Sequence, residues 1–336
     1  MKSIVATRFG EPDEVLELKT LPDPQPPGPG EVVVRVTKRQ LHPGNLSMIR
    51  GRFNIPLPAG GLVPGDDGVG VVEAVGAGAA KGLKPGAKVI FSSTPGAWSE
   101  LLKTRADLVT PIPDVLSDAI AAQLPLNTVT ALLLLRAAQR EAPNAGNDIP
   151  ILLTAAGSAV ARIVIVAARR RGMKTIGVVR SAAGVKALSS RFPDVPVFST
   201  AGSYWLDEVR RAAGERPLQV IMDPIGGAIV RDLAGLLGSE GAILFYGGLA
   251  AESIVFPSIG LAYNEIKFKG VSSSRWLQNT SAEQRRADVA EAIEIGLAAP
   301  EQFDVEADYD LARFIDAIEH MQRAGRNGAV LISSNS

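Results

Sequence analysis

The sequence contains no cysteine and only two histidines. Without cysteine, the 336-residue chain can form neither a disulfide nor a thiolate nucleophile. Lys plus Arg equals Asp plus Glu at 35 each, so no overall field attracts nucleic acid or an anionic membrane. No uninterrupted apolar run reaches the roughly 18 residues of a membrane span, and the N-terminus lacks the apolar centre of a signal peptide. We expect a cytoplasmic protein that binds neither nucleic acid nor membrane.

The composition and the chain pattern predict two kinds of domain. Hydrophobic residues make up 46% of the chain and charged residues 21%, which favours a large buried core. Short apolar strands punctuated by Gly and Pro occupy the first hundred residues, as in 31–36, 68–75 and 87–91. From residue 116 onward, helical stretches and strands alternate, which is typical of a parallel sheet covered by helices.

Residues 149–181 read as one complete strand, turn, helix and strand. The turn at 155–161 consists of small residues and one valine, and the predicted helix covers 163–171. Small residues let backbone N–H groups approach a pyrophosphate at the helix N-terminus, so we expect Gly157, Ser158, Ala159 and Val160 to bind a dinucleotide. An ordinary tight turn stays open as an alternative, because Ala159 and Ala161 replace glycines of the G-x-G-x-x-G pattern.

The second strand of this unit, 175–179, ends in Arg180 and Ser181. NAD enzymes usually place Asp or Glu there, whereas an NADP enzyme must accommodate a phosphate. A guanidinium can bind that phosphate bidentately, and the serine hydroxyl can donate another hydrogen bond. The sequence therefore predicts NADP(H) as the cofactor, with a merely solvated arginine as the alternative.

Motifs along nearly the whole chain resemble the medium-chain dehydrogenase/reductase superfamily. The similar segments, in order, are ATRFGEPDEVLEL, GDDGVGVVEAVGAG, GLKPGAKVI, GAWSELL, PLNTVTALLLL, ILLTAAGSAVARIVI, VVRS, DPIGG, LFYGGLA and FKGVSSSRW. Their order and spacing are most similar to the zinc-independent quinone oxidoreductases and 2-enoyl thioester reductases. This resemblance implies an α/β fold: a β-rich GroES-like catalytic domain at 1–119 and 266–336, and a Rossmann-type doubly wound parallel sheet at 120–265.

The resemblance also implies how the nicotinamide is held and how the chain assembles. It places the nicotinamide near Asn127 and Thr130, and near the backbone of Tyr246, Gly247 and Gly248, with Trp276 as a further cofactor-binding residue. A plain helix-start role for Thr130 remains open. Strands near 267–273 commonly pair across a two-fold axis in this superfamily, so we expect a homodimer.

The metal-binding residues of zinc-dependent relatives are missing. A tetrahedral zinc site needs Cys, His and carboxylate ligands in suitable number, and His42 beside the adjacent Asp66 and Asp67 makes a poor set. The other histidine, His320, falls in a polar helical stretch, where a solvated side chain is expected. We therefore expect chemistry without a metal.

The proton-donor position departs from the family pattern. Similar enoyl-thioester reductases carry a tyrosine in a segment reading roughly INPSDINMIQGNY, and the matching LHPGNLSMIRGRF ends in Phe53. Phenylalanine cannot donate a hydrogen bond, and the family's Asn and Asp are replaced by His42 and Asn45. His42 is a candidate acid because histidine titrates near neutral pH, although a packed or solvated histidine is the alternative.

Two hypotheses about function follow. The first is an NADPH-dependent reductase that passes a hydride to a small-molecule substrate, either a quinone or an activated double bond of an enone or enoyl thioester. The second is an NADPH-binding sensor or structural protein with little or no turnover. Sequence alone does not name the substrate, because loops form the pocket.

Overall fold

The computed structural model describes residues 1–53, 55–78, 82–143, 145–250, 252–323 and 325–334. The chain divides into two compact units. Unit 1 comprises 1–126 and 279–336, and unit 2 comprises 127–278. We expected the divisions at 119/120 and 265/266. The later second division has a clear cause, because a strand at 267–270 pairs within the unit 2 sheet.

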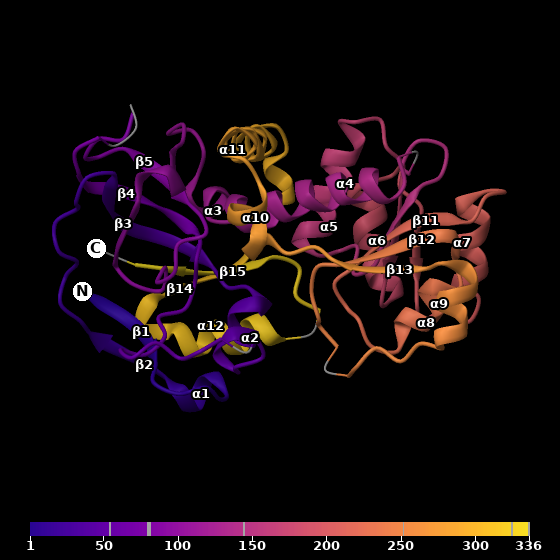
Figure 1. Ribbon diagram of the computed structural model, residues 1–336, viewed down its shortest axis with the longest axis horizontal. Helices are drawn as coiled ribbons and strands as arrows, with labels where there is room; N and C mark the ends of the chain where they lie inside the picture. Colours follow the sequence, from indigo (N-terminus) through magenta and orange to yellow (C-terminus); the bar gives the residue numbers. More distant parts are fainter. Residues whose placement is uncertain (54, 79–81, 144, 251, 324, 335–336) are drawn as a thin grey trace. The chain divides into compact units, whose positions relative to one another are not determined.

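Unit 1 is built on a mainly antiparallel sheet, in which the edge strand β14 pairs in parallel with β15 (Figure 1). Its seven-stranded sheet runs in the order β14-β15-β3-β4-β5-β7, with β6 also paired to β3, and β1 and β2 form a separate pair. The strands are β1 (Lys2–Ala6), β2 (Leu16–Thr20), β3 (Glu31–Gln40), β4 (Gly68–Val75), β5 (Lys88–Phe91), β6 (Leu101–Arg105), β7 (Val109–Pro111), β14 (Val305–Asp310) and β15 (Ala329–Ser333). The helices are α1 (Pro12–Val15), α2 (Pro43–Ile49), α3 (Asp118–Ala121), α11 (Ala282–Ala298) and α12 (Phe314–Gln322).

The alternation predicted for the start of β3 places its valines in the core. Val32, Val34 and Val36 are fully buried and pack with β4 and β5 residues such as Val72 and Phe91. Alternate residues of a strand face the same side of a sheet, so this spacing produces one continuous apolar face. A second cluster joins α12 to β15 and to the strand β1.

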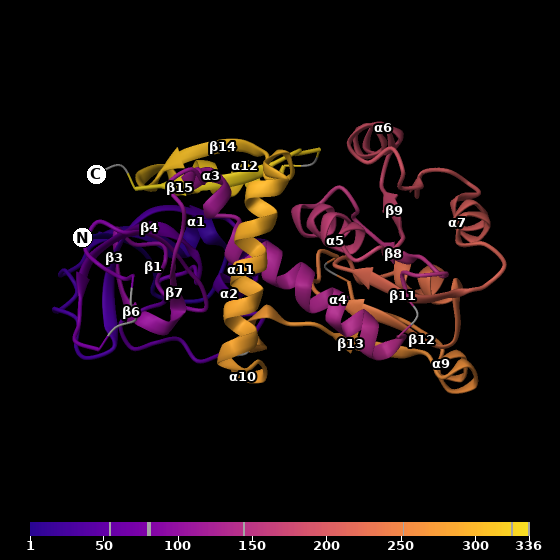
Figure 2. The same ribbon diagram turned by 90° about the horizontal axis from the view of Figure 1, so that it is seen from above.

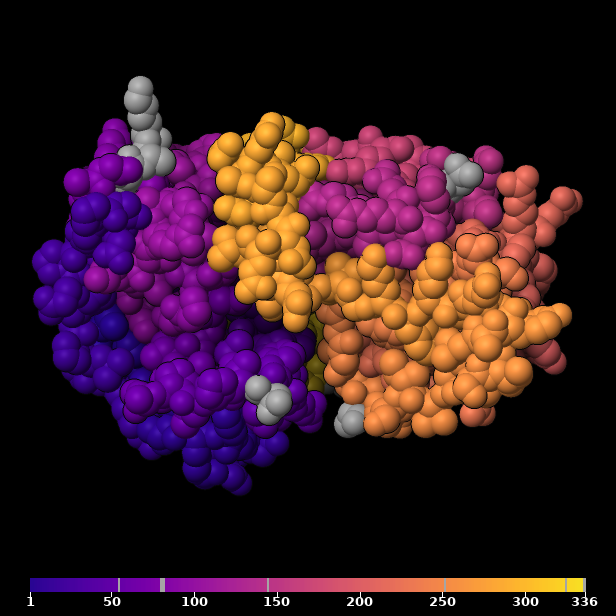
Figure 3. Space-filling view, viewed as in Figure 1, coloured from indigo at the N-terminus to yellow at the C-terminus, as the bar shows by residue number. Residues whose placement is uncertain are grey.

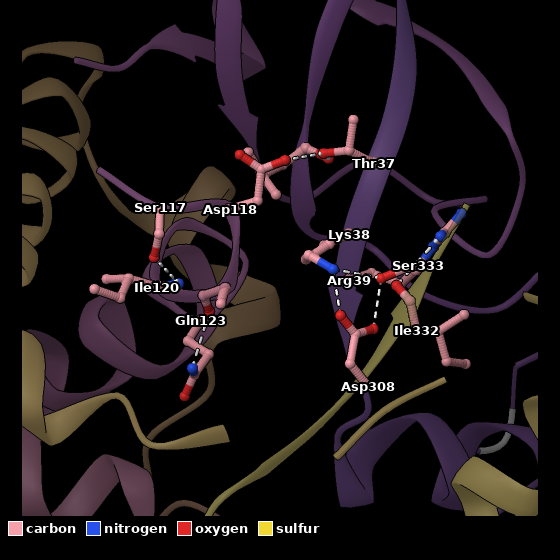
Figure 4. A network of polar contacts seen from close by, with 12 residues as sticks. Thr37, Lys38, Arg39, Ser117, Asp118, Ile120, Gln123, Asp308, Ile332 and Ser333 are labelled. Carbon is pink, nitrogen blue, oxygen red and sulfur yellow. Dashed lines mark hydrogen bonds and ion pairs between the residues drawn. The ribbon is translucent and has the colours of Figure 1, made fainter. Parts of the chain in front are cut away.

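A fully buried arginine ties the last strand of unit 1 to the first half of the chain. Arg39 donates from Nε to Ala97 O at 2.9 Å, from Nη2 to Ser99 O at 2.6 Å and from Nη1 to Ile332 O at 3.3 Å. Burial lowers the pKa of Arg39 to about 9, so the guanidinium stays charged at neutral pH. Beside it, Lys38 bonds Ser333 Oγ at 2.6 Å and pairs with Asp308 (Figure 4).

Unit 2 contains a six-stranded parallel sheet in the order β10-β9-β8-β11-β12-β13 (Figure 2). The strands are β8 (Ile151–Leu153), β9 (Thr175–Val179), β10 (Val197–Ser199), β11 (Leu218–Asp223), β12 (Leu237–Phe245) and β13 (Lys267–Gly270). The helices are α4 (Val129–Glu141), α5 (Ala159–Arg169), α6 (Ala182–Arg191), α7 (Trp205–Ala213), α8 (Ile229–Ala234), α9 (Ser258–Asn264) and α10 (Trp276–Asn279).

The strand order of unit 2 reverses direction at β8. Successive strands run outward from β8 through β9 to β10, and then from β11 through β12 to β13 on the other side. Such a reversal creates a crevice at the carboxyl ends of the central strands, where α/β proteins bind ligands. The central strands carry buried apolar residues, as Leu152, Ile221 and Ile243 illustrate. This doubly wound parallel sheet and the β-rich unit 1 confirm the predicted fold class.

Among the described residues, no helix is both long enough and apolar enough to cross a membrane.

Candidate functional site

In unit 1, the first turn of α2 fixes the backbone of His42. Pro43 is the first helical residue, where its missing N–H costs nothing and its fixed φ favours the helix. Asn45, in the same turn, accepts a hydrogen bond at Oδ1 from His42 N at 2.9 Å. His42 and Asn45 are both buried, at 4% and 5% exposure. The structure therefore brings together these two candidate residues.

The imidazole of His42 faces a carboxylate from a distant part of the chain. Its Nε2 lies 3.3 Å from Oδ1 and 3.3 Å from Oδ2 of Asp67, which precedes β4. Asp67 is buried as well, and the neighbouring Asp66 is half-buried. A buried ion pair with this proximity holds the ring in a single orientation.

Burial and neighbouring charges act in opposite directions on His42. Burial lowers the pKa of His42, but the Asp67 and Asp66 carboxylates outweigh that effect, so its pKa is raised above the ordinary value. Burial, reinforced by the charge of Asp67, raises the pKa of Asp66 to about 6. The two carboxylates therefore favour the protonated form of the ring, which is the form that can give up a proton.

Phe53 differs from this buried cluster because its side chain is exposed. It sits in the turn after α2, and 53% of its surface is exposed. An exposed phenyl ring offers contact area to a substrate but no proton.

In unit 2, the turn after β8 leads into the N-terminus of α5, whose first N–H groups are free of partners within the helix. The helix begins at Ala159 rather than at residue 163 as predicted, because Ser158 caps it and accepts from Ala161 N at 3.3 Å. Ala159 and Val160 thus supply first-turn N–H groups, which have no partner within the helix. Gly157 is exposed, and a Cβ atom there would meet nothing within 4 Å. A phosphate could approach this turn without displacing protein atoms.

Arg180 and Ser181 follow β9 as predicted, at the same edge of the sheet. Ser181 caps α6 by accepting from Gly184 N at 3.2 Å, and its hydroxyl hydrogen is not used by that bond. Arg180 is exposed. Both side chains are placed where an anionic group could reach them from solvent.

Three side chains expected near the nicotinamide are buried in unit 2. Asn127 and Thr130 are buried at 4% and 6% exposure, and Thr130 is the second residue of α4. Trp276, which starts α10, is buried at 4%. These three residues are ordered by packing and not by solvent-facing loops.

The segment after β12 carries the remaining candidates. Burial raises the pKa of Tyr246, and its interaction with the Ser158 hydroxyl opposes that rise. Gly247 and Gly248 are exposed, and a Cβ on Gly247 would lie 2.8 Å from Pro224 O. The close approach of the two loops thus requires glycine at 247.

His320 differs from its expected solvated state. Its Nδ1 lies 2.9 Å from the Tyr309 hydroxyl, and its side chain is 16% exposed. The two rings also pack edge to face, because β14 lies against α12. His320 is therefore a packed residue of unit 1.

Comparison with known proteins identifies similar chains over most of this sequence. The alcohol dehydrogenase GroES-like domain family matches residues 28–114. The mitochondrial enoyl-[acyl-carrier-protein] reductase of Rattus norvegicus is 28% identical over 288 residues, covering 84% of this chain and 75% of the relative. The corresponding protein of Dictyostelium discoideum is 27% identical and covers 98% and 94% of the two chains.

Solved structures of similar fold include quinone reductases. A Bacillus thuringiensis protein assigned as an NADPH:quinone reductase is 27% identical, with a TM-score of 0.88 and coverage of 99% of both chains. These comparisons support a place for the chain in the medium-chain dehydrogenase/reductase superfamily, since its relatives and structural neighbours are enoyl reductases and quinone oxidoreductases. The chain is an oxidoreductase. The Escherichia coli quinone oxidoreductase, at 21% identity and a TM-score of 0.83, shares the fold.

The sequence analysis missed some polar residues of this site or gave them another role. Asp66 and Asp67 were considered only as poor zinc ligands, whereas Asp67 pairs with His42. Thr154 and Asp223 were not singled out, although Thr154 directly follows β8 and Asp223 ends the neighbouring strand β11. Over the described ranges, no group of three or more His, Asp and Glu side chains is arranged to hold a metal ion.

Proposed function

We propose that this oxidoreductase is an NADPH-dependent reductase that passes a hydride to a quinone or to an activated double bond without using a metal. The mitochondrial relatives are enoyl-[acyl-carrier-protein] reductases, and the Bacillus thuringiensis neighbour is assigned to quinone reduction. Both reactions add hydride to a carbonyl-conjugated acceptor and a proton to the resulting anion. The proposal covers this shared chemistry.

The cofactor is NADP(H). The capped N-terminus of α5 and the open space at Gly157 fit a pyrophosphate, and Arg180 with Ser181 fits a 2′-phosphate. When bound, NADPH supplies the hydride. The protein's own residues bind, orient and protonate.

The buried His42–Asp67 pair is the observation that carries the proposed reaction. Asp67 accepts at His42 Nε2, so in the doubly protonated ring the other N–H group is at Nδ1, and we assign the transferred proton to it. Loss of that proton to the oxygen of a reduced acceptor leaves a neutral imidazole, which is reprotonated from solvent. Asn45 holds the backbone of His42, so the ring does not swing away as its charge changes.

The exposed Phe53 favours quinones over simple enoyl thioesters. A hydroquinone oxygen accepts a proton from solvent or from His42, whereas an enolate from a thioester gains more from a positioned hydroxyl. Phe53 supplies only an apolar surface, on which a flat aromatic acceptor can pack.

The test is NADPH oxidation by the purified full chain against a panel of quinones, enones and enoyl thioesters, with NADH as the comparison cofactor and direct titration of NADPH binding. We expect turnover with quinones and tight NADPH binding. Tight binding with no turnover on any acceptor would instead identify an NADPH-binding sensor, and absence of binding would reject the proposal.

A further inference from the structure

Two polar side chains meet at the carboxyl edge of the unit 2 sheet. Thr154 follows β8, and Asp223 ends the adjacent β11. Thr154 Oγ1 donates to Asp223 Oδ1, and Asp223 Oδ2 accepts from Gly226 N at 2.7 Å. Both side chains are fully buried, with no exposed surface. Such a bond in a low-dielectric interior strongly restricts the groups that it joins.

Thr154 leads directly into the phosphate turn. The next residue, Ala155, has φ of 45°, a left-handed conformation that costs an alanine about 1–2 kcal/mol. Ser158 N donates to Ala155 O at 2.8 Å, so the strained residue sets the path toward the helix cap. A strained backbone persists only where its surroundings fix it, and Thr154 supplies that anchor.

Asp223 leads directly into the turn at 224–227. Gly226 and Gly227 both have positive φ, at 72° and 67°. Pro224 O accepts from Leu249 N at 3.0 Å, and Ile225 O accepts from Ala250 N at 2.8 Å. The turn that Asp223 holds therefore fixes the segment after β12.

Asp223 accepts several hydrogen bonds. The Thr154 hydroxyl and the backbone N–H groups of Gly226 and Ile225 donate to it, and the same hydroxyl lies 3.4 Å from Met222 O. Burial raises the pKa of Asp223, and these three donors act against that rise.

We infer that Thr154 and Asp223 form a positioning pair, which holds the phosphate turn and the 246–250 segment in one frame. This inference rests on the proposed function, because the phosphate turn is assigned there to the pyrophosphate, and on the expectation from the family resemblance that the backbone of 246–248 lies near the nicotinamide. Neither side chain is required to touch the cofactor. The adenosine end, at Arg180 and Ser181 beyond β9, lies outside the pair's hydrogen bonds.

The test compares Thr154→Val with the matched variant Thr175→Val. Thr175 is also a buried threonine of the same sheet, but it starts β9 and so lies at the amino edge. Valine keeps the shape and removes the hydroxyl. For Thr154→Val we expect KM for NADPH to rise and kcat to fall, each by roughly 5- to 100-fold, the range for unpairing a buried charged group. Thr175→Val leaves both within about twofold, and Thr154→Ser restores most of the loss.

Two further measurements separate positioning from general damage. Inhibition by 2′-AMP, which carries only the adenosine end, should be unchanged in Thr154→Val. Amide hydrogen exchange should speed up at 224–228 and 246–250 in Thr154→Val and not in Thr175→Val, with or without cofactor.

Equal exchange in the two valine variants, or equal loss of NADPH and 2′-AMP affinity, overturns the pair's role. If the wild type fails to bind NADPH, the proposed function falls and the cofactor role of the pair falls with it. The exchange data still report whether Thr154 fixes the two loops, so the two failures are distinguishable.

Discussion

His42 and Asp67 form an ion pair in which one ring nitrogen lies 3.3 Å from each carboxylate oxygen, with side chains 5% and 4% exposed. They are separated by 25 residues and come from two different elements of unit 1. Removing one member of a buried pair leaves the other charge without compensation. Substitution of either His42 or Asp67 should therefore destabilise this unit.

The chain's two histidines provide a matched test of the proton donor. His42→Ala should lower kcat with quinones by the roughly 10²- to 10⁴-fold that a positioned acid contributes, with NADPH affinity unchanged. His320→Ala serves as the control, because His320 packs against Tyr309 and takes no part in the site. Similar kcat values for the two variants would show that solvent supplies the proton.

The contributions of Asp66 and His42 to stability should fall as pH rises, opposite to those of the carboxyl groups whose pKa is lowered, such as Glu141. Asp66 has a folded pKa of about 6 against an ordinary 3.8, so between these values the unfolded chain releases a proton that the folded chain keeps. His42, with a raised pKa, adds stability that is present below about pH 6.5 and lost above its folded pKa. Urea unfolding from pH 4 to 6 should show the wild type losing stability relative to Asp66→Asn, by at most about 3 kcal/mol. A decline of the same size in the variant would place its origin elsewhere.

Phe53→Tyr should raise activity on enoyl thioesters. The new hydroxyl supplies the donor that the family segment carries, with a gain of up to roughly 10²-fold, the lower end for a positioned acid. The exposed side chain at 53 accommodates the extra oxygen without repacking. Steady-state kinetics would measure the ratio of kcat/KM for an enoyl thioester to kcat/KM for a quinone. An equal ratio in the wild type and in Phe53→Tyr would show that position 53 does not supply the donor.

Cofactor preference should depend on Arg180. A lost charge-assisted contact costs about 1.5–3 kcal/mol, so Arg180→Ala should weaken NADPH binding roughly ten- to a hundredfold and leave NADH nearly unaffected. Arg216→Ala is the control, because Arg216 is exposed and precedes β11 at the amino edge of the sheet. Calorimetric titration of both cofactors would decide, and a wild type that prefers NADH would contradict the assignment.

We also propose a homodimer formed through the β13 edge of unit 2. Exposed apolar side chains gather on α9 and the segment before it, which reach the surface in Figure 3; they are Leu249, Val255, Ile259 and Tyr263, at 55%, 67%, 74% and 84% exposure. Patches of this kind mark association surfaces. Light scattering should give twice the 35.2 kDa chain mass, and Ile259→Asp should give the single mass. A wild-type mass of one chain would reject the dimer.

The sequence predicted features that depend on local order and missed those that depend on distant pairing. Arg180 and Ser181 were predictable because a strand's end is visible in its apolar run. The Asp67–His42 and Thr154–Asp223 contacts were not, since each joins residues from separate elements. The start of α5 was misplaced by four residues, because a run of small residues suits a turn and a helix equally and only the Ser158 cap decides.

The place of β15 in its sheet gives the chain an order of assembly. This strand, at 329–333, lies between β14 and β3, and it is pinned by Arg39 through Ile332 O. Unit 2 is a single continuous stretch, so all of its residues have left the ribosome while the unit 1 sheet still lacks two of its strands. Unit 2 can therefore fold during synthesis, whereas unit 1, which carries His42, must wait for β14 and β15 and stays open to proteases until they arrive.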